Sequence, residues 1–535
     1  MQNKFSFSSP SKNSNSQIGF PLGFALILLT LLACLLSQRN FAYFRDYSIT
    51  FEGAYRLALG QIPYKDFGSP VGPVSFLIPA VFFKLFGASL QVFQIAQLFT
   101  NFIHLVLLVF IFQKLALPVR LQFASMLLFG FAYLIFLTHP WYNSTGFLSL
   151  ELVILLSLYQ KKLWILINGM LCAASILTKQ DFGVVSIFNA SVIYLLVDAS
   201  GSTLRLRSHF SELFSRAFFY QLLTTFSIFI AGLGIGLSLF ILCTSPADFF
   251  YWFNYGQEPH HPRSPSFRSL TQNSYGLINL IAIFFCWKFK RVNLLIAALI
   301  IFSASLTRQT SGLGFTHYYY VLALPIVLYE IYLCPWKYKF IALLLALVFS
   351  VQLLKKPLRD TYFVMESMVL HQPEHFFFDY RENSQPLTKF PADFVALNQE
   401  SVPQETIEGI QAIKAYVAQF NGTPKVLNLS ELTPIYAELK VAPPKHLPLW
   451  FHTNFSLFPR EIEQLNQSFE NADYDVIILQ GAHEGLTTTY QKFLDLLSNN
   501  PKYHLLTNIY NSPGVGTGPC TKDCDGNIFV FTLMK

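Results

Sequence analysis

The chain has 535 residues, of which 53% are hydrophobic and only 13% charged, and its formal net charge is +7. Soluble globular chains carry about 25% charged residues, so this composition excludes an ordinary soluble protein and indicates an integral membrane protein. Residues 1–354 hold 23 Lys and Arg against 10 Asp and Glu, whereas residues 355–535 hold 14 against 20. We therefore predict a basic membrane domain followed by an acidic water-soluble domain.

Apolar stretches in the first domain predict an α-helical integral membrane protein, because many of them approach the length that crosses a bilayer. There are eleven, at 18–37, 91–112, 121–138, 146–160, 163–178, 182–198, 217–243, 274–287, 292–306, 319–334 and 340–354. A polar tail at 1–17 precedes them. A further stretch, 74–87, is short and contains Pro79 and Lys84, so its role depends on the orientation of the chain.

Positive charge in the connecting loops predicts that orientation. If 74–87 does not cross, 12 Lys and Arg share one side, in loops 113–120, 161–162, 199–216, 288–291 and 335–339. The later loops on the other side carry only Lys179, Arg263, Arg268 and Arg308. We therefore expect a cytoplasmic N-terminus and a helix at 74–87 that lies at the outer face. The first loop (38–90) and the tail (355–535) are then extracytoplasmic.

The tail alternates predicted strands with predicted helices. We expect strands at 425–429, 474–481, 503–510 and 528–533, and helices at 402–420, 459–470 and 486–499. This alternation predicts a small soluble α/β domain. Cys520 and Cys524 lie within it. If the tail is extracytoplasmic, a disulfide between these two residues is one alternative and free thiols are the other. The sequence contains no patch of basic and aromatic residues of the kind that indicates nucleic-acid binding.

Acidic residues are concentrated in the first outer loop. Its sequence "RDYSITFEGAYRLALGQIPYKDFGSPVGP" contains Asp46, Glu52 and Asp66, half of the six acids that we expect outside before residue 355. Residues 47–59 have helical spacing, so Asp46 stands at the start of a helix, where a carboxylate serves as a cap. The alternative is that one of these carboxylates carries out chemistry at the boundary between water and membrane.

The segment "RDYSITFEGAYRLALGQIPYKDFGSPVGPVSFLIPAVFFKLFG" resembles the first outer loop of bacterial GT-C glycosyltransferases. These include relatives of protein O-mannosyltransferases and lipid A aminoarabinose transferases. The segments "WYNSTGFLSLELV", "GMLCAASILTKQDFG" and "GFTHYYYVLALP" are similar to later spans of such enzymes, so that the resemblance covers residues 18–334. The sequence departs from the family pattern at Tyr47. In the family an acidic residue often stands there, next to the aspartate that corresponds to Asp46.

The resemblance implies that a sugar moves from a polyprenyl phosphate to an acceptor outside the cytoplasm. In such a reaction a carboxylate takes the acceptor's proton while the acceptor attacks the anomeric carbon of the sugar. The attack inverts the configuration of that carbon. Asp46 is the expected base and Asp66 the next catalytic candidate. Glu52 and Tyr64 are expected to line the same cavity.

Cations are expected beside the leaving lipid phosphate. Lys179 and Arg308 stand at predicted outer span ends, and His317 follows Arg308 closely in sequence. The alternative for the two cations is contact with lipid headgroups, and for His317 a hydrogen bond within an aromatic belt. No cofactor is certain from these residues, and a divalent metal stays open.

One helix carries a polar stripe. Gln91, Gln94, Gln97, Asn101 and His104 are spaced by three or four residues in "QVFQIAQLFTNFIH" and share a helical face. In lipid such a face must meet protein or water. Both interhelical hydrogen bonding and a cavity wall, with Gln97 and Asn101 as lining residues, fit this pattern.

These observations together predict an inverting glycosyltransferase of the bacterial inner membrane. Its partners are a polyprenyl-phosphate-linked sugar, a lipid, glycan or protein acceptor, and the bilayer. The rival prediction is a transporter or flippase of lipid-linked glycans, or an inactive relative of the enzymes. A transporter is expected to hold ionisable groups near the middle of the membrane, whereas here the acids cluster in one outer loop.

Overall fold

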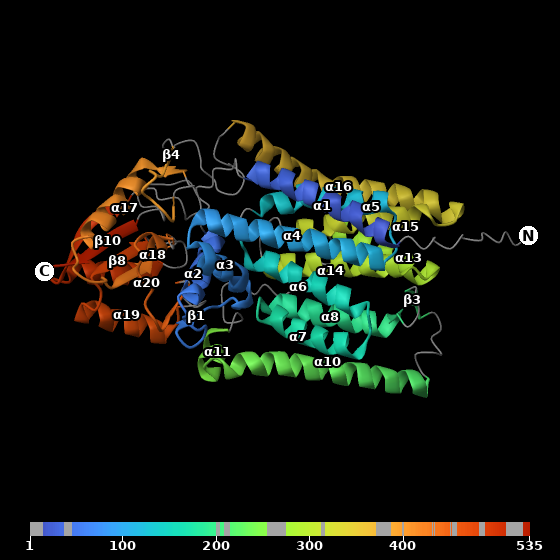
Figure 1. The fold of residues 1–535 in the computed structure, drawn as a ribbon, viewed down its shortest axis with the longest axis horizontal. Helices are drawn as coiled ribbons and strands as arrows, with labels where there is room; N and C mark the ends of the chain where they lie inside the picture. The colour runs from blue at the N-terminus through green and yellow to red at the C-terminus, as the bar shows by residue number, and fades with distance from the viewer. Residues whose placement is uncertain are drawn as a thin grey trace, which may run out of the picture.

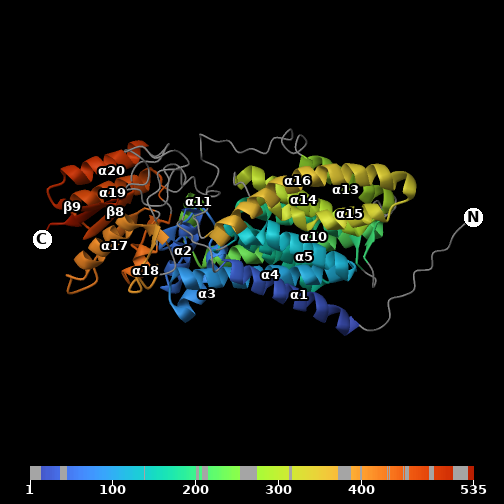
Figure 2. The ribbon, with the colours of Figure 1, turned by 90° about the horizontal axis from the view of Figure 1, so that it is seen from above.

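The structure is a computed structural model. It describes residues 14–36, 45–137, 139–199, 204–207, 215–253, 274–311, 316–370, 387–397, 401–430, 432, 434–449, 451, 457–480, 487–509 and 528–534. The molecule is elongated, with a bundle of helices at one end and an α/β domain at the other (Figures 1 and 2). Between them lie the helices of the first outer loop, which therefore touch both parts.

Every apolar stretch predicted as a span coincides with helix. The bundle helices are α1 (Ser14–Leu36), α4 (Leu90–Lys114), α5 (Val119–Ala132), α6 (Tyr142–Ser157), α7 (Lys162–Ile176), α8 (Gln180–Leu196), α10 (Arg216–Leu242), α13 (Ser274–Phe289), α14 (Val292–Ser311), α15 (Leu324–Tyr332) and α16 (Trp336–Leu370). Short 3-10 turns, η1 (Leu134–Phe136) and η2 (Thr316–Leu322), follow α5 and precede α15. A two-stranded hairpin, β2 (Val197–Asp198) and β3 (Arg205–Leu206), links α8 toward α10.

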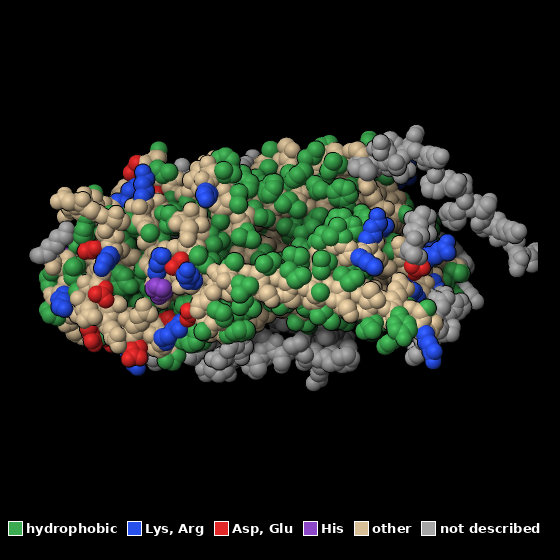
Figure 3. Space-filling model, turned by 60° about the horizontal axis from the view of Figure 1, so that its bottom comes forward, with side chains coloured by type: hydrophobic (Ala, Val, Ile, Leu, Met, Phe, Trp, Pro, Cys, Tyr) green, Lys and Arg blue, Asp and Glu red, His purple; other side chains and the backbone are tan. Residues whose placement is uncertain are grey.

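The outer surface of the bundle is apolar. Among the described residues, three helical segments are long and apolar enough to cross a membrane, namely Leu90–Lys114, Val119–Phe136 and Arg216–Leu242. On the face shown in Figure 3, hydrophobic side chains cover the middle of the molecule and charged side chains gather toward its two ends. Large exposed apolar side chains such as Leu77, Phe110 and Leu239 belong to that surface. Such a belt suits the hydrocarbon core of a bilayer.

The predicted boundary at residue 355 falls inside a continuous helix, because α16 extends to Leu370. The charge change at Lys355 and Lys356 is therefore not a break in the structure. A helix keeps its own backbone hydrogen bonds after it leaves the apolar belt, so a gain of charge alone does not end it.

The segment predicted to be the first outer loop folds as two helices joined by residues 59–73. Helix α2 (Arg45–Ala58) packs on α3 (Val74–Phe86), and the short strand β1 (Phe67–Gly68) lies between them in sequence. Their shared core is aromatic, since the Phe51 ring lies 4.8 Å from the Phe83 ring and 5.3 Å from that of Phe93 in α4. The loop is therefore fixed to the bundle by packing.

The C-terminal region forms a mixed four-stranded sheet in the order β6-β8-β10-β9. Its strands are β6 (Val426–Leu429), β8 (Val476–Gln480), β9 (Tyr503–Ile509) and β10 (Ile528–Leu533), with β6 parallel to β8 and β10 antiparallel to both neighbours. The main helices are α17 (Gln404–Val417), α18 (Ile435–Glu438), α19 (Pro459–Asn471) and α20 (Thr487–Asn499). These elements lie close to the predicted ranges. Short strands β4 (Leu387–Lys389) and β5 (Ser401–Pro403) pair with each other, and Cys520 and Cys524 lie outside the described residues.

Candidate functional site

Helix α2 carries the residue predicted to be the base. The helix begins at Arg45, so Asp46 is its second residue and not the cap that precedes it. A carboxylate in the first turn still interacts favourably with the helix dipole. The side chain of Asp46 lies outside the described atoms, so its role stays a prediction.

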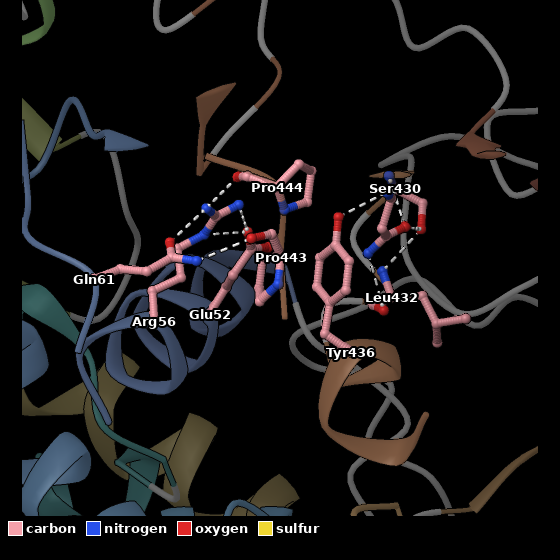
Figure 4. Close-up of polar contacts among 9 residues, drawn as sticks. Glu52, Arg56, Gln61, Ser430, Leu432, Tyr436, Pro443 and Pro444 are labelled. Atoms are coloured by element: carbon pink, nitrogen blue, oxygen red, sulfur yellow. Dashed lines mark hydrogen bonds and ion pairs between the residues drawn. The ribbon is translucent and has the colours of Figure 1, made fainter. Parts of the chain in front are cut away.

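Glu52 forms a buried ion pair with Arg56 (Figure 4). Arg56 Nη2 and Nε donate to Glu52 Oε1 at 2.6 and 2.8 Å, and both side chains are 1% exposed. Arg56 Nη1 also donates to Gln61 Oε1 at 3.0 Å and to the Pro444 carbonyl at 2.7 Å. Gln61 in turn donates to the Pro443 carbonyl. We call Glu52, Arg56, Gln61, Pro443 and Pro444 the loop clamp, because it fastens the outer loop to the C-terminal region.

Burial raises the pKa of the Glu52 carboxyl, and the charge and hydrogen bonds of Arg56 partly offset that rise. Glu52 was predicted to line a cavity. The side chain is buried, its Oε1 accepts hydrogen bonds from Arg56, and its Oε2 has no hydrogen-bond partner among the described residues, so a place in a cavity wall stays a prediction.

The turn after α2 holds Asp66. Helix α2 ends at Ala58, and the turn after it contains Gly60, whose φ of +85° is a conformation that suits glycine. Asp66 then accepts a hydrogen bond from the Ile62 amide at 2.8 Å and pairs with Lys445 at 3.0 Å. Partial burial favours the neutral carboxyl, but the Ile62 amide and Lys445 outweigh it, so the pKa of Asp66 is lowered. A lowered pKa makes Asp66 a weaker base.

The backbone after Asp66 extends this contact. Strand β1 pairs in parallel with β7 (Leu447–Pro448), and the Leu449 amide donates to the Gly68 carbonyl at 2.9 Å. Tyr64, another predicted cavity residue, is fully buried against Phe240 and Phe249, with ring centroids 6.0 and 5.1 Å away. Burial raises the pKa of Tyr64 well above its usual value. Its place is therefore in an aromatic core.

The outer loop is seated directly on the turn that leads to Lys179. The Gly72 amide donates to the Thr178 carbonyl at 3.0 Å, and the Val74 amide to the Leu177 carbonyl at 3.2 Å. A Cβ on Gly72 would lie 1.7 Å from the Leu177 carbonyl oxygen, so only glycine permits this approach. The turn between α7 and α8 is thus in direct contact with the end of the outer loop.

Lys179 is 4% exposed and stands immediately before α8. Its Nζ donates to Asn143 Oδ1 at 3.2 Å, lies 3.5 Å from Asp181 Oδ2, and sits 5.3 Å from the centre of the Tyr142 ring. A snorkelling lysine keeps its ammonium in water. The burial of Lys179 therefore argues against simple headgroup contact and fits a fixed cation at the end of the bundle that meets the predicted outer loop.

The other two donor-site candidates lie where α14 gives way to η2. Arg308 is half-buried in the last turn of α14. His317 is in η2, and its side chain lies outside the described atoms. Two η2 neighbours are anchored, since Tyr318 donates to Asp360 of α16 and Tyr319 donates to Glu151 of α6 at 2.7 Å. The structure thus fixes the segment without testing either role.

The polar stripe of α4 meets α6. Gln97 donates to Asn101 at 2.7 Å, and both are fully buried. His104 Nδ1 lies 3.0 Å from Glu151 Oε1, and its Nε2 lies 3.4 Å from Ser144 Oγ. Interhelical hydrogen bonding, one of the two explanations of the stripe, is therefore present. Gln97 Oε1 and Asn101 Nδ2 have no partner among the described residues.

Sequence reasoning missed the loop clamp. The spacing of Glu52 and Arg56 is a local signal, because residues four apart on a helix form ion pairs. No sequence signal connects them with Pro443 and Pro444, which lie almost 400 residues away. Within the described residues, no three His, Cys, Asp or Glu side chains are grouped to hold a metal ion.

Comparison with known proteins gives limited similarity. No protein-family model and no curated protein sequence matches the chain. Among solved structures, the chain is similar to the crystal structure of ArnT from Cupriavidus metallidurans bound to undecaprenyl phosphate, with a TM-score of 0.47 and 12% identity. The apo structure of the same protein gives 0.46 and 13%. Each comparison covers 96% of this chain and 98% of the other.

Proposed function

We propose that this protein is an inverting glycosyltransferase that moves a sugar from a polyprenyl-phosphate donor to an acceptor outside the cytoplasm. The resemblance of residues 45–87 to the first outer loop of such enzymes suggests the reaction. The observation that supports it in the structure is the seating of that loop on the turn before Lys179. These hydrogen bonds bring the end of the loop that contains Asp46 against the turn before the buried Lys179, which supports a shared site.

In this proposal Asp46 accepts the proton of the attacking acceptor hydroxyl, amine or phosphate. Asp66 is the weaker candidate, because Lys445 and the Ile62 amide lower its pKa. Lys179 balances the charge of the lipid phosphate that leaves, and Arg308 of α14 and His317 of η2 extend that cationic site. The acceptor is a glycolipid, a polysaccharide or a protein.

Placement in the cell follows from the same proposal. The end of the bundle far from the C-terminal region carries exposed cations, at Arg120, Lys161, Lys162, Arg205, Arg216, Lys288, Lys290 and Arg291. The positive-inside rule assigns such an end to the cytoplasm. We therefore propose a bacterial inner-membrane protein with its first outer loop and C-terminal α/β domain in the extracytoplasmic space.

The rival function, transport or flipping of a lipid-linked glycan, is favoured by one observation. Glu151 and His104 are ionisable groups buried between helices of the bundle, and such groups mark transport pathways in many membrane proteins. Here they contact each other and Tyr319, which suits a structural pair. We rank this function second.

The test is a reconstituted reaction. Purified full-length protein, a synthetic polyprenyl-phosphate sugar and a panel of envelope acceptors are incubated, and released polyprenyl phosphate is quantified. The proposal predicts acceptor-dependent release and a glycoside with the opposite anomeric configuration to the donor. Movement of intact donor across vesicles without release would support the rival instead.

A further inference from the structure

At the end of the bundle far from the loop clamp, a small pocket opens between α8, the β2–β3 hairpin and the start of α10. It is lined by Gln160, Tyr194, Arg207, Phe218, Gln221, Leu222 and Thr225. Its volume of about 20 Å³ admits one water-sized group. No carboxylate is among the lining residues, so the pocket offers one cation and several neutral hydrogen-bonding groups.

Arg207 is the cation in this pocket. Its backbone amide donates to the Leu196 carbonyl at 2.9 Å, which fixes the hairpin strand against the end of α8. The guanidinium lies over the Phe218 ring at 4.8 Å. Its Nε is shielded from solvent and has no hydrogen-bond partner among the described residues. A shielded guanidinium nitrogen without an acceptor is costly, so an anion here stabilises the fold.

The neutral lining residues are arranged to share such an anion. Gln221 and Thr225 are four residues apart on α10 and so lie on one face of it. The side-chain amide of Gln160 already donates to the Val197 carbonyl at 2.8 Å, which holds the opposite wall in place. One oxygen of a tetrahedral anion, placed between Arg207 and α10, matches both the charge of the pocket and its size.

The residues around the pocket suit the depth of lipid headgroups. Tyr159, Trp164 and Tyr220 are exposed nearby, with 37%, 37% and 66% of their surfaces accessible, and such aromatic residues mark the membrane interface. Helix α10 then exposes Leu223, Ile230 and Leu239 along its length. A lipid with its phosphate at Arg207 therefore has an apolar helix face on which to lay an acyl chain.

We propose that this pocket binds the phosphate group of an anionic membrane lipid, with one phosphoryl oxygen held by Arg207 and α10. Basic pockets between helices at the membrane interface are suited to acidic lipid headgroups. The site is distinct from the proposed transfer site, because it lies at the opposite end of the bundle (Figure 1).

The experiment measures lipid binding to the purified full-length protein in detergent by native mass spectrometry, with phosphatidylglycerol and phosphatidylcholine as probes. Wild-type protein should retain phosphatidylglycerol in preference to phosphatidylcholine. Arg207→Gln should weaken the phosphatidylglycerol affinity roughly five- to tenfold, because one arginine–phosphate interaction at a membrane surface is lost. The matched control is Arg205→Gln, two residues away in the same hairpin but exposed and outside the lining, which should change the affinity less than about twofold.

A second variant keeps the test valid if Arg207→Gln does not fold. Replacing Gln221 by Leu and Thr225 by Val removes the neutral donors from exposed or half-buried helix positions and should also weaken phosphatidylglycerol binding. Equal losses for Arg205→Gln and Arg207→Gln would overturn the proposal, because they would show diffuse surface attraction. Displacement of the lipid by millimolar inorganic phosphate would also overturn it, by showing that the pocket serves a soluble anion.

Discussion

Replacing Arg56 with Met tests whether the loop clamp holds the outer loop as described. The substitution removes the four hydrogen bonds that the guanidinium donates, two to Glu52, one to Gln61 and one to the Pro444 carbonyl. It leaves the Glu52 carboxylate buried without a counter-charge. Removal of one partner of a buried ion pair costs about 3–5 kcal/mol, so we expect the free energy of unfolding to fall by that amount.

The double variant Glu52→Gln/Arg56→Met separates the charge from the packing. With both charges gone, no buried carboxylate lacks a counter-charge. The decrease in the free energy of unfolding should then shrink to about 1–3 kcal/mol, for the hydrogen bonds that Gln61 and Pro444 lose. The coupling between the two sites, read from a double-mutant cycle, should therefore be at least about 2 kcal/mol. The measurement is chemical unfolding in mixed detergent micelles, followed by intrinsic fluorescence.

The stability of the single variant Arg56→Met should depend on pH in a definite direction. Burial raises the pKa of Glu52 above that of the unfolded chain, so protonation of Glu52 favours the folded state and its ionisation costs stability as pH rises. Without Arg56 the pKa of Glu52 rises further. The stability difference between wild-type protein and Arg56→Met should therefore become smaller as the pH is lowered from neutral toward about 5. A loss of less than about 1 kcal/mol at neutral pH would refute the buried clamp.

Three more predictions concern the seat of the loop, the donor cation and the orientation. Gly72→Ala should destabilise the protein by about 1–3 kcal/mol or more, because its Cβ meets the Leu177 carbonyl, whereas Gly234→Ala, which meets nothing within 4 Å, should be neutral or stabilising in thermal unfolding. Lys179→Gln should reduce photo-crosslinking to a polyprenyl-phosphate probe with the melting temperature preserved; undiminished crosslinking would remove Lys179 from the donor site. A reporter active only outside the cytoplasm, fused after Lys535, should give signal, and a silent reporter would reverse the orientation.

The sequence predicted local structure well because local structure depends on neighbours in the chain. Apolar runs located the bundle helices, and alternation located β6 and β8 of the C-terminal region. The start of α2 was misplaced by two residues, since helix ends depend on capping contacts. The boundary at 355 was inferred from charge, whereas α16 continues to Leu370.

The candidate site was predicted less well because its contacts join distant segments. Asp66 was predicted as the second catalytic candidate, and no sequence pattern connects it with its partner Lys445, which is far along the chain. The seat of Gly72 on Thr178 is likewise a long-range contact. Composition indicates which residues can do chemistry, and only the fold decides which of them are already engaged.

The central claim is that the first outer loop carries the base for sugar transfer, and Asp46→Asn tests it most directly. The amide keeps the size of the side chain and removes its basicity, so the transfer rate should fall roughly 10²–10⁴-fold. The cost in stability at the second position of α2 should stay within about 1 kcal/mol. The measurement is the rate of polyprenyl-phosphate release by purified wild-type and Asp46→Asn protein, with Asp66→Asn as the control and thermal unfolding alongside. The account predicts a large loss for Asp46→Asn and a smaller one for Asp66→Asn; near-normal transfer by Asp46→Asn at unchanged stability would contradict it.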